Sequence, residues 1–149
     1  MKRVYTATLF GEIREAGSGT KTEEYKGVDS FVAQEDIELI GLELTLMPTL
    51  PMGNDGLAWC RAELSQTSDL AKPGIIMEAP NVNEWNTTPA YGGHPTTQVF
   101  CMFPEGKVIP LKEEGRVYLN YEVNTESLTA GFYTARLFAI IYYTKKSSK

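Results

Sequence analysis

Very few residues of this chain could carry catalytic chemistry. Its one histidine, His94, lies in the turn-rich segment Tyr91-Gly92-Gly93-His94-Pro95. Nucleophilic catalysis of the Ser-His-acid or Cys-His kind needs a histidine held beside the nucleophile, which an exposed loop residue does not provide. A metal site would need further ligands, but no His-x-x-His, Cys-x-x-Cys or calcium-loop spacing occurs. We therefore expect no catalytic residues and no metal site.

Carboxylates come in adjacent pairs, as in Glu23-Glu24, Glu35-Asp36 and Glu113-Glu114. Adjacent residues of a strand point to opposite faces, so these pairs favour solvated surface charge, with a glycoside-cleaving pair as the alternative. No Gly-x-Gly-x-x-Gly pattern follows a strand and no phosphate-binding Gly-Lys-Ser/Thr loop exists, which predicts that the protein uses no cofactor. The sequence thus favours a non-enzymatic protein.

A long polar segment, residues 80–97, is the best candidate for ligand or partner binding, because long loops in small domains are usually functional. Trp85 and Tyr91 offer flat aromatic faces among polar neighbours such as Asn86 and His94. Such a set suits a glycan or a protein partner. The other interpretation is that Trp85 folds inward and covers the core.

The two cysteines, Cys60 and Cys101, each lie within an apolar stretch typical of a strand. Two buried thiols are the first interpretation, and a disulfide between the two strands is the alternative.

Strands, rather than helices, must position these residues. Apolar and polar side chains alternate along most of the chain, most clearly from Ile40 to Leu46. Ile37 and Leu39 have the opposite parity, which predicts either a bulge near Leu39 and Ile40 or a strand covered on both faces. The further expected strands are 4–10, 20–25, 58–64, 74–78, 98–103, 117–123 and 132–144. Turn clusters rich in glycine separate them, so we predict a single all-β domain, residues 1–149, that forms an antiparallel sandwich of about eight to ten strands.

The last expected strand is apolar on both faces in its second half. Tyr133, Ala135, Leu137, Ala139, Ile141 and Tyr143 share one face. Phe138, Ile140 and Tyr142 lie on the other. Such a strand is central in its sheet with both sides covered, or is covered by another subunit, so we expect these three residues to make assembly contacts.

Charge is unevenly distributed along the chain. The net charge is −5, yet residues 4–144 contain 19 acidic and only nine basic side chains, while the ends carry Lys2, Arg3, Lys145, Lys146 and Lys149. An acidic body argues against a nucleic-acid partner. The basic C-terminal run is either a solvated tail or an arm that reaches an acidic neighbour, such as an identical subunit. With no apolar run of signal-peptide or membrane-spanning length, we expect no exported leader and no membrane contact.

The last third of the chain resembles small jelly-roll proteins of virus and phage particles. The resemblance rests on Phe103-Pro104-Glu105-Gly106, then Ile109-Pro110-Leu111, then Glu114-Gly115-Arg116-Val117-Tyr118-Leu119, and on the final Ile140-Ile141-Tyr142-Tyr143. It implies a jelly-roll-like fold and a virion protein of the capsid decoration, minor capsid or fibre-associated kind, made in a host cytoplasm. It also implies a homo-oligomer, a trimer among the candidates, that contacts other virion proteins. A carbohydrate-binding or receptor-recognition module that uses residues 80–97 is the alternative.

Overall fold

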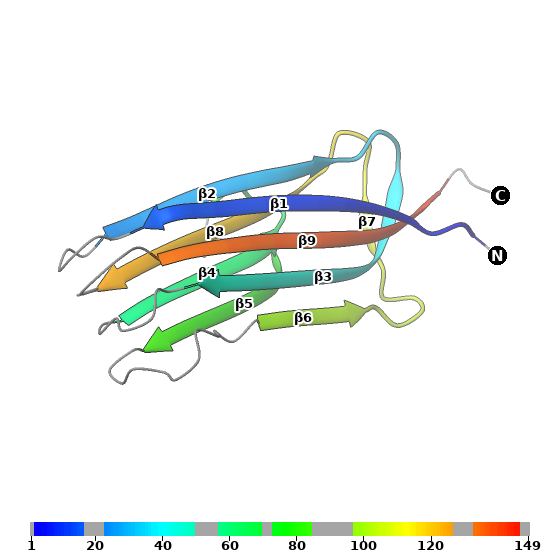
Figure 1. The fold of residues 1–149 in the computed structure, drawn as a ribbon. Coiled ribbons are helices and arrows are strands. Elements are labelled where there is room, and N and C mark those ends of the chain that lie inside the picture. Colours follow the sequence, from blue (N-terminus) through cyan, green and yellow to red (C-terminus); the bar gives the residue numbers. More distant parts are fainter. Residues whose placement is uncertain are drawn as a thin grey trace.

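The computed structural model describes residues 2–16, 23–49, 57–69, 73–84, 97–126 and 133–146, which form strands and no helix (Figure 1). No helix that could cross a membrane occurs in these segments. The strands are β1 (Tyr5–Ala16), β2 (Glu23–Val32), β3 (Ile37–Thr49), β4 (Leu57–Ser65), β5 (Ile75–Glu84), β6 (Thr97–Met102), β7 (Ile109–Leu111), β8 (Arg116–Glu126) and β9 (Tyr133–Lys145).

Two antiparallel sheets pack face to face, as the sequence predicted (Figure 1). One sheet has the order β1-β9-β3-β6, with the short β7 also paired to β3, and the other has the order β2-β8-β4-β5. When β7 is set aside, the first strand pairs with the last and the second with the second to last, while β3 pairs with β6 and β4 with β5. Such nesting of antiparallel pairs is the jelly-roll arrangement.

The bulge predicted in β3 is confirmed. Leu39 pairs with Tyr143 and Gly41 with Tyr142, so Ile40 is the extra residue. A bulge shifts the side-chain parity by one. This shift lets Ile37 and Leu39 on one side of it, and Leu42 and the leucines that follow on the other, all face the interior.

The core lies between the two sheets and is almost wholly aliphatic. Its fully buried large apolar side chains are Ile37, Leu39, Leu42, Leu44, Leu46, Leu64, Leu119, Leu137 and Ile141. Burial of each contributes on the order of 2 kcal/mol relative to exposure. The alternation along β9 is also confirmed, because Leu137, Ala139 and Ile141 are buried while the residues between them are half-exposed.

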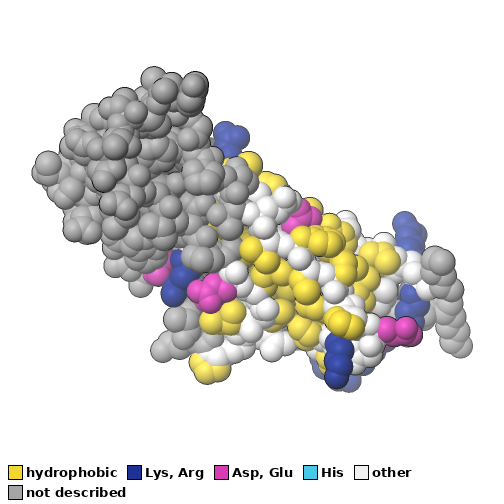
Figure 2. All heavy atoms as spheres, turned by 90° about the horizontal axis from the view of Figure 1, so that it is seen from below, with side chains coloured by type: hydrophobic (Ala, Val, Ile, Leu, Met, Phe, Trp, Pro, Cys, Tyr) yellow, Lys and Arg dark blue, Asp and Glu magenta, His cyan; other side chains and the backbone are white. Residues whose placement is uncertain are grey.

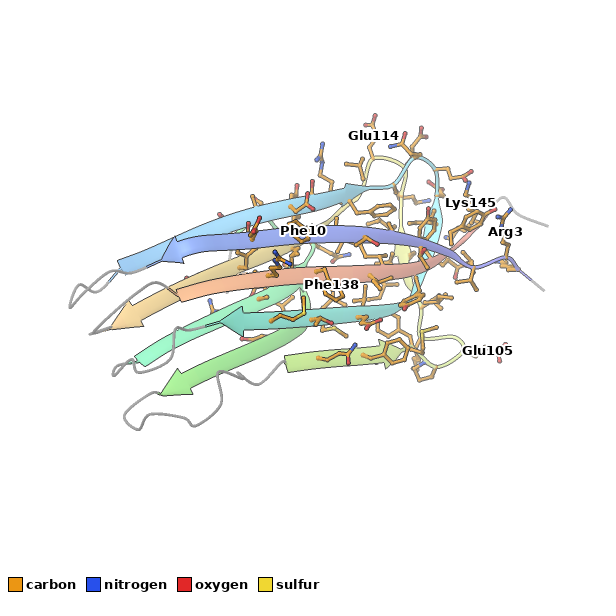
Figure 3. All side chains as sticks on the ribbon, viewed as in Figure 1. Arg3, Phe10, Glu105, Glu114, Phe138 and Lys145 are labelled. Atoms are coloured by element: carbon orange, nitrogen blue, oxygen red, sulfur yellow. The ribbon has the colours of Figure 1, made fainter. Side chains whose placement is uncertain are left out.

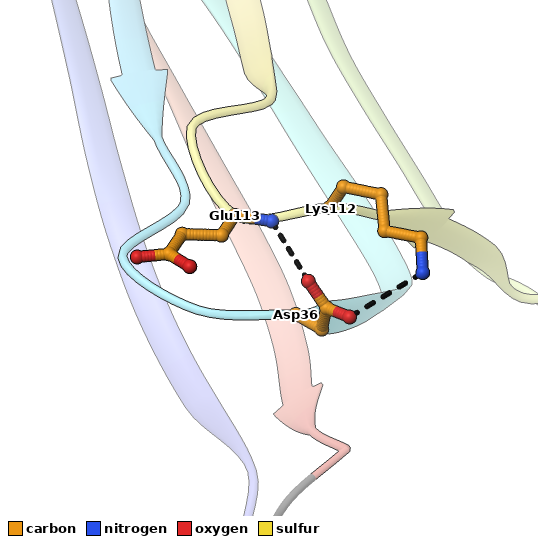
Figure 4. A network of polar contacts seen from close by, with 3 residues as sticks. All are labelled: Asp36, Lys112 and Glu113. Atoms are coloured by element: carbon orange, nitrogen blue, oxygen red, sulfur yellow. Dashed lines mark hydrogen bonds and ion pairs between the residues drawn. The ribbon is translucent and has the colours of Figure 1, made fainter.

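A polar turn ties the β2–β3 connection to the β7–β8 connection at one end of the sandwich (Figure 4). The backbone N–H of Glu113 donates to Asp36 Oδ1 at 2.9 Å, and Lys112 Nζ lies 3.4 Å from Asp36 Oδ2. Glu114 adopts a φ of 69°, and its N–H donates to the carbonyl of Ala33. These contacts hold the two connections together.

Two strand predictions need correction. Residues 80–84, expected in the long loop, belong to β5, and Thr97 belongs to β6. Pro80 can lie within β5 because β5 is the edge of its sheet, where a missing N–H breaks no ladder hydrogen bond. The short β7, centred on Pro110, was not predicted as a strand at all.

Candidate functional site

The outer face of the β1-β9-β3-β6 sheet carries a group of apolar side chains, which we call the apolar face. Its members are Phe10 on β1, Phe138, Ile140 and Tyr142 on β9, and Phe100 and Met102 on β6. All have the parity opposite to that of the core-facing residues of their strands, which are Leu9 on β1, Leu137, Ala139 and Ile141 on β9, and Val99 on β6. Phe10, Phe100 and Met102 are 53%, 57% and 46% exposed, and the three β9 residues are half-exposed.

Cross-strand pairing brings these side chains together. Phe10 lies directly opposite Phe138, and the two point from neighbouring strands to the same side (Figure 3). The rings of Phe100 and Tyr142 meet edge to face, with centroids 6.0 Å apart, although one strand lies between β6 and β9. That strand contributes Gly41 at this level, and a side chain there would collide with the sulfur of Met102. The glycine therefore lets the aromatic and methionine side chains close over β3.

One carboxylate lies within the apolar face, and its hydrogen bonds are internal. Glu43 accepts from Gln98 Nε2 at 2.5 Å and from the Tyr142 hydroxyl at 3.1 Å. Loss of hydration, followed by this hydrogen bond and the nearby charge of Glu43, raises the pKa of Tyr142. Tyr142 is therefore a neutral donor at physiological pH, and the charge of Glu43 is held inside the face.

The outer face of the other sheet has a different character. Arg61 pairs with Glu122 at 3.3 Å, and Asn120 donates to the carbonyl of Thr67 at 2.8 Å. Glu63 is fully buried beside Asn120. Polar side chains that bond to one another in this way do not offer an apolar contact surface. Among the described residues, the other sheet exposes two large apolar side chains, Val28 and Ile75, and these lie on its two opposite edge strands, β2 and β5.

The predicted contacts Lys145 and Lys146 lie at the end of β9, beside the start of the chain. Lys145 Nζ lies 2.9 Å from Glu35 Oε1 and 4.6 Å from the centre of the Tyr5 ring. The hydrogen bond to Glu35, opposed by partial loss of hydration, raises the pKa of Lys145. Arg3 stacks over the same ring of Tyr5, so Arg3 and Lys145 form a basic cluster at this end (Figure 3).

The other predicted contacts lie outside the described residues. These are Trp85, Asn86, Tyr91 and His94 of the long loop, and Lys149 of the tail. The predictions made for them stay predictions.

The thiol prediction is corrected in one respect. Cys101 is a free thiol and is exposed rather than buried, because β6 is the edge strand of its sheet. The side chain of Cys60 lies outside the described part of the chain. Among the described residues, no three His, Cys, Asp or Glu side chains lie close enough together to hold a metal ion.

Sequence reasoning found the β9 members of the apolar face but missed Phe10, Phe100 and Met102. Strand alternation indicates that Phe10 faces outward, because it follows Leu9, a core residue. Alternation does not show which sheet face Phe100 and Met102 occupy, because residues 99–103 are apolar at every position. Only the strand order places these residues on the same sheet face as the β9 residues.

Comparison with known proteins gave similarities of fold alone. No protein family model and no curated protein matches the chain. Among solved structures, it is similar to that of the Gx strain of infectious bursal disease virus, with 14% identity and a TM-score of 0.30 over 99% of this chain and 38% of the other. The VP2 subviral particle of the same virus has 14% identity and a TM-score of 0.30, and the match covers 98% of this chain and 38% of the other. The particle of extra small virus from the giant freshwater prawn Macrobrachium rosenbergii has 9% identity and a TM-score of 0.28, and the match covers 97% of this chain and 81% of the other. The chain thus spans about two fifths of the length of the first two.

Proposed function

We propose that this protein is a non-enzymatic structural subunit of a larger assembly, a virion, and that it acts through contacts made by the apolar face. The observation that carries the proposal is the grouping of Phe10, Phe138, Ile140, Tyr142, Phe100 and Met102 on one outer sheet face. Contiguous apolar surface on a small domain usually marks a contact site, because water is released when a partner covers it.

The fold alone does not choose between the two functions that the sequence left open. Jelly rolls serve both as capsid domains and as lectin domains, so function must come from the surface. Glycan sites combine an aromatic platform with hydrogen-bonding groups directed at the ligand. On the apolar face the carboxylate of Glu43 is already engaged by Gln98 and Tyr142. This arrangement favours burial against protein.

The virion is the assembly that the resemblance of the last third of the chain implies. Capsid decoration and minor capsid roles both need a compact subunit that binds its neighbours through its sides. A jelly roll with the apolar face on one sheet, and with ion-paired and hydrogen-bonded side chains on the outside of the other, meets that need. We further propose that the subunit contacts copies of itself and other virion proteins.

The basic cluster at the end of β9 supports a second contact. Lys145 holds Glu35 within its own chain, and Arg3 remains exposed beside it. The acidic body of a neighbouring subunit offers complementary charge. Removal of residues 145–149 would then weaken the assembly, and more so at low salt, where surface charges are less screened.

The decisive test is the native mass at micromolar concentration of the wild type and of a Phe10→Glu, Phe100→Glu variant. Both substituted side chains are more than half exposed, so folding should survive. Val28→Glu is the matched control, because Val28 is also 53% exposed but lies on the other sheet. We expect the wild type and the control to assemble and the double variant to remain monomeric. A monomeric wild type, or a double variant that assembles normally, would overturn the proposal.

A further inference from the structure

The two sheets end in edge strands, and all but one of these edges are protected. An unprotected edge offers its free N–H and C=O groups to another strand, and proteins block edges with charge or proline. β1, β2 and β5 each contain charged residues, and β5 and β7 contain Pro80 and Pro110. On β1, in addition, the N–H of Phe10 is covered by the Asp29 carboxylate at 2.9 Å.

β6 has none of these protections. Its six residues, Thr97–Met102, include no charged residue and no proline. Its side chains are exposed on both sides of the sheet, since Phe100 and Met102 point to the apolar face while Cys101, of opposite parity, is exposed as well. Seen from below Figure 1, hydrophobic side chains gather on this side of the molecule (Figure 2). Among the described strands, β3 is the only one that pairs with β6.

The hydrogen-bond pattern shows which backbone groups of β6 face outward. The N–H of Phe103 donates to the carbonyl of Ile40 on the β3 side, at 2.8 Å. Backbone groups alternate in direction along an antiparallel strand, so Cys101 and Val99 also face β3. The backbone N–H and C=O groups of Gln98, Phe100 and Met102 then face away from β3, at the free edge of the sheet.

We propose that β6 of one copy pairs antiparallel with β6 of a second copy, about a twofold axis at Phe100. This inference rests on the proposed function and names the partner at the β6 edge of the sheet that carries the apolar face. The outward residues 98, 100 and 102 are symmetric about 100, so an antiparallel copy presents the same three residues in matching register. The backbone N–H and C=O of each of these residues then bond to the residue opposite it in the second copy.

A second copy fits this edge because the contact is self-complementary. Like charges directly opposite one another are destabilising across a strand pair, and β6 brings none to the axis. The pairing joins the two β1-β9-β3-β6 sheets and makes their apolar faces continuous. A twofold contact of this kind is isologous and closes on itself as a dimer.

The register makes a specific geometric claim. With Phe100 opposite Phe100 of the second copy, Val99 lies opposite Cys101 in a non-hydrogen-bonded pair. The Cα atoms of such a pair are about 4.5 Å apart, within the range that a disulfide spans. Cys101 is a free thiol and therefore serves as the reporter.

The test is mild oxidation of a Val99→Cys variant, with Cys60→Ser included so that no other native thiol takes part. We expect a covalent dimer on a non-reducing gel that forms at least about tenfold faster than in a Gln98→Cys variant. Gln98 is the matched control, because it is exposed on the same strand but lies opposite Met102 of the partner. Equal rates in the two variants would overturn the register.

A charge at the axis provides a second measurement. Phe100→Lys places two ammonium groups opposite each other, whereas Phe10→Lys makes the same change on the far edge of the same face. We expect Phe100→Lys to weaken the dimer by at least about tenfold and Phe10→Lys to weaken it less. A wild type that assembles but is unaffected by Phe100→Lys and forms no Val99→Cys dimer overturns this inference and leaves the proposed function standing. A wild type that forms only trimers with no twofold contact also overturns the inference of β6 pairing. A monomeric wild type overturns both this inference and the proposed function.

Discussion

The carboxylate of Asp29 on β2 accepts a 2.9 Å hydrogen bond from the backbone N–H of Phe10 on β1, and so joins the edges of the two sheets. The other oxygen of the same carboxylate accepts from the N–H of Ser30. Phe10 directs its amide to β2 and not to β9, so it forms a non-hydrogen-bonded pair with Phe138, in which side chains lie closest. The contact closes one side of the sandwich, whereas β6 leaves the opposite side of its sheet open.

Asp29→Ala removes this closure. We expect the free energy of unfolding to fall by about 1 kcal/mol, because a backbone donor loses its charged acceptor at a partly solvated edge. The amide of Phe10 should also exchange with deuterium faster. Urea denaturation and hydrogen exchange measure the two effects. Asp29→Asn keeps an acceptor oxygen and should retain most of the stability, and equal losses in both variants would show that the hydrogen bond does not matter.

A second prediction concerns Tyr121 on β8, whose ring lies against two glycines, one on β1 of the opposite sheet and one on the adjacent β2. A Cβ atom built on Gly11 would lie 2.6 Å from Tyr121 Cε1, and one built on Gly27 would also overlap the ring. We expect Gly11→Ala to cost about 1–3 kcal/mol of unfolding free energy, as overpacking does. Urea denaturation measures it.

The same substitution in a Tyr121→Leu background provides the control. The smaller side chain leaves room for the methyl group, so Gly11→Ala should cost markedly less there. An identical cost in both backgrounds would mean that the ring is not the obstacle.

The fold was predictable where a strand alternates strictly and uncertain where it does not. Leu42, Leu44 and Leu46 repeat every second residue, and the opposite parity of Leu39 indicates either a bulge or a strand covered on both faces, of which the structure has the bulge. The sequence predicts a polar loop at residues 80–84, since Pro80 and its asparagine neighbours are residue types with low strand propensity. Their inclusion in β5 depends on the edge position of that strand, which is a property of the topology.

The apolar face was only half predictable for a related reason. The parity of β9 separates Phe138 and Ile140 from the core, but no pattern within the sequence says that β1 and β6 lie in the same sheet. The meeting of Phe100 with Tyr142 joins residues 42 positions apart across an intervening strand. Long-range pairing of this kind has no local signal.

A third prediction follows from Asp36. The hydrogen bond from the Glu113 amide, aided by the charges of Lys112 and Lys146, holds the pKa of Asp36 below its ordinary value of 3.8. The folded-state pKa is depressed, so the stabilisation is present above pH 3.8 and is lost as the pH falls through the folded value. We expect wild-type stability to decline in that acidic window and Asp36→Asn to be less stable at neutral pH but less sensitive to acid. Thermal unfolding of both proteins between neutral and acidic pH measures this. If the contact contributes nothing, the melting temperatures of the wild type and of Asp36→Asn will change in parallel with pH.

The last prediction uses the strained backbone of the β7–β8 turn. Glu114 has a φ of 69°, a left-handed conformation that costs a residue with a side chain about 1–2 kcal/mol. Its N–H donates to Ala33 and the following Gly115 carbonyl accepts from Ala33, so the turn is held in this shape from the β2–β3 side. Glu114→Gly relieves the strain and keeps both hydrogen bonds, and it should raise the free energy of unfolding by about 1 kcal/mol, less the extra chain entropy of glycine. Glu113→Gly, one residue earlier and without a positive φ, should lower it. Urea denaturation of the two variants would contradict the strain argument if both lose stability equally.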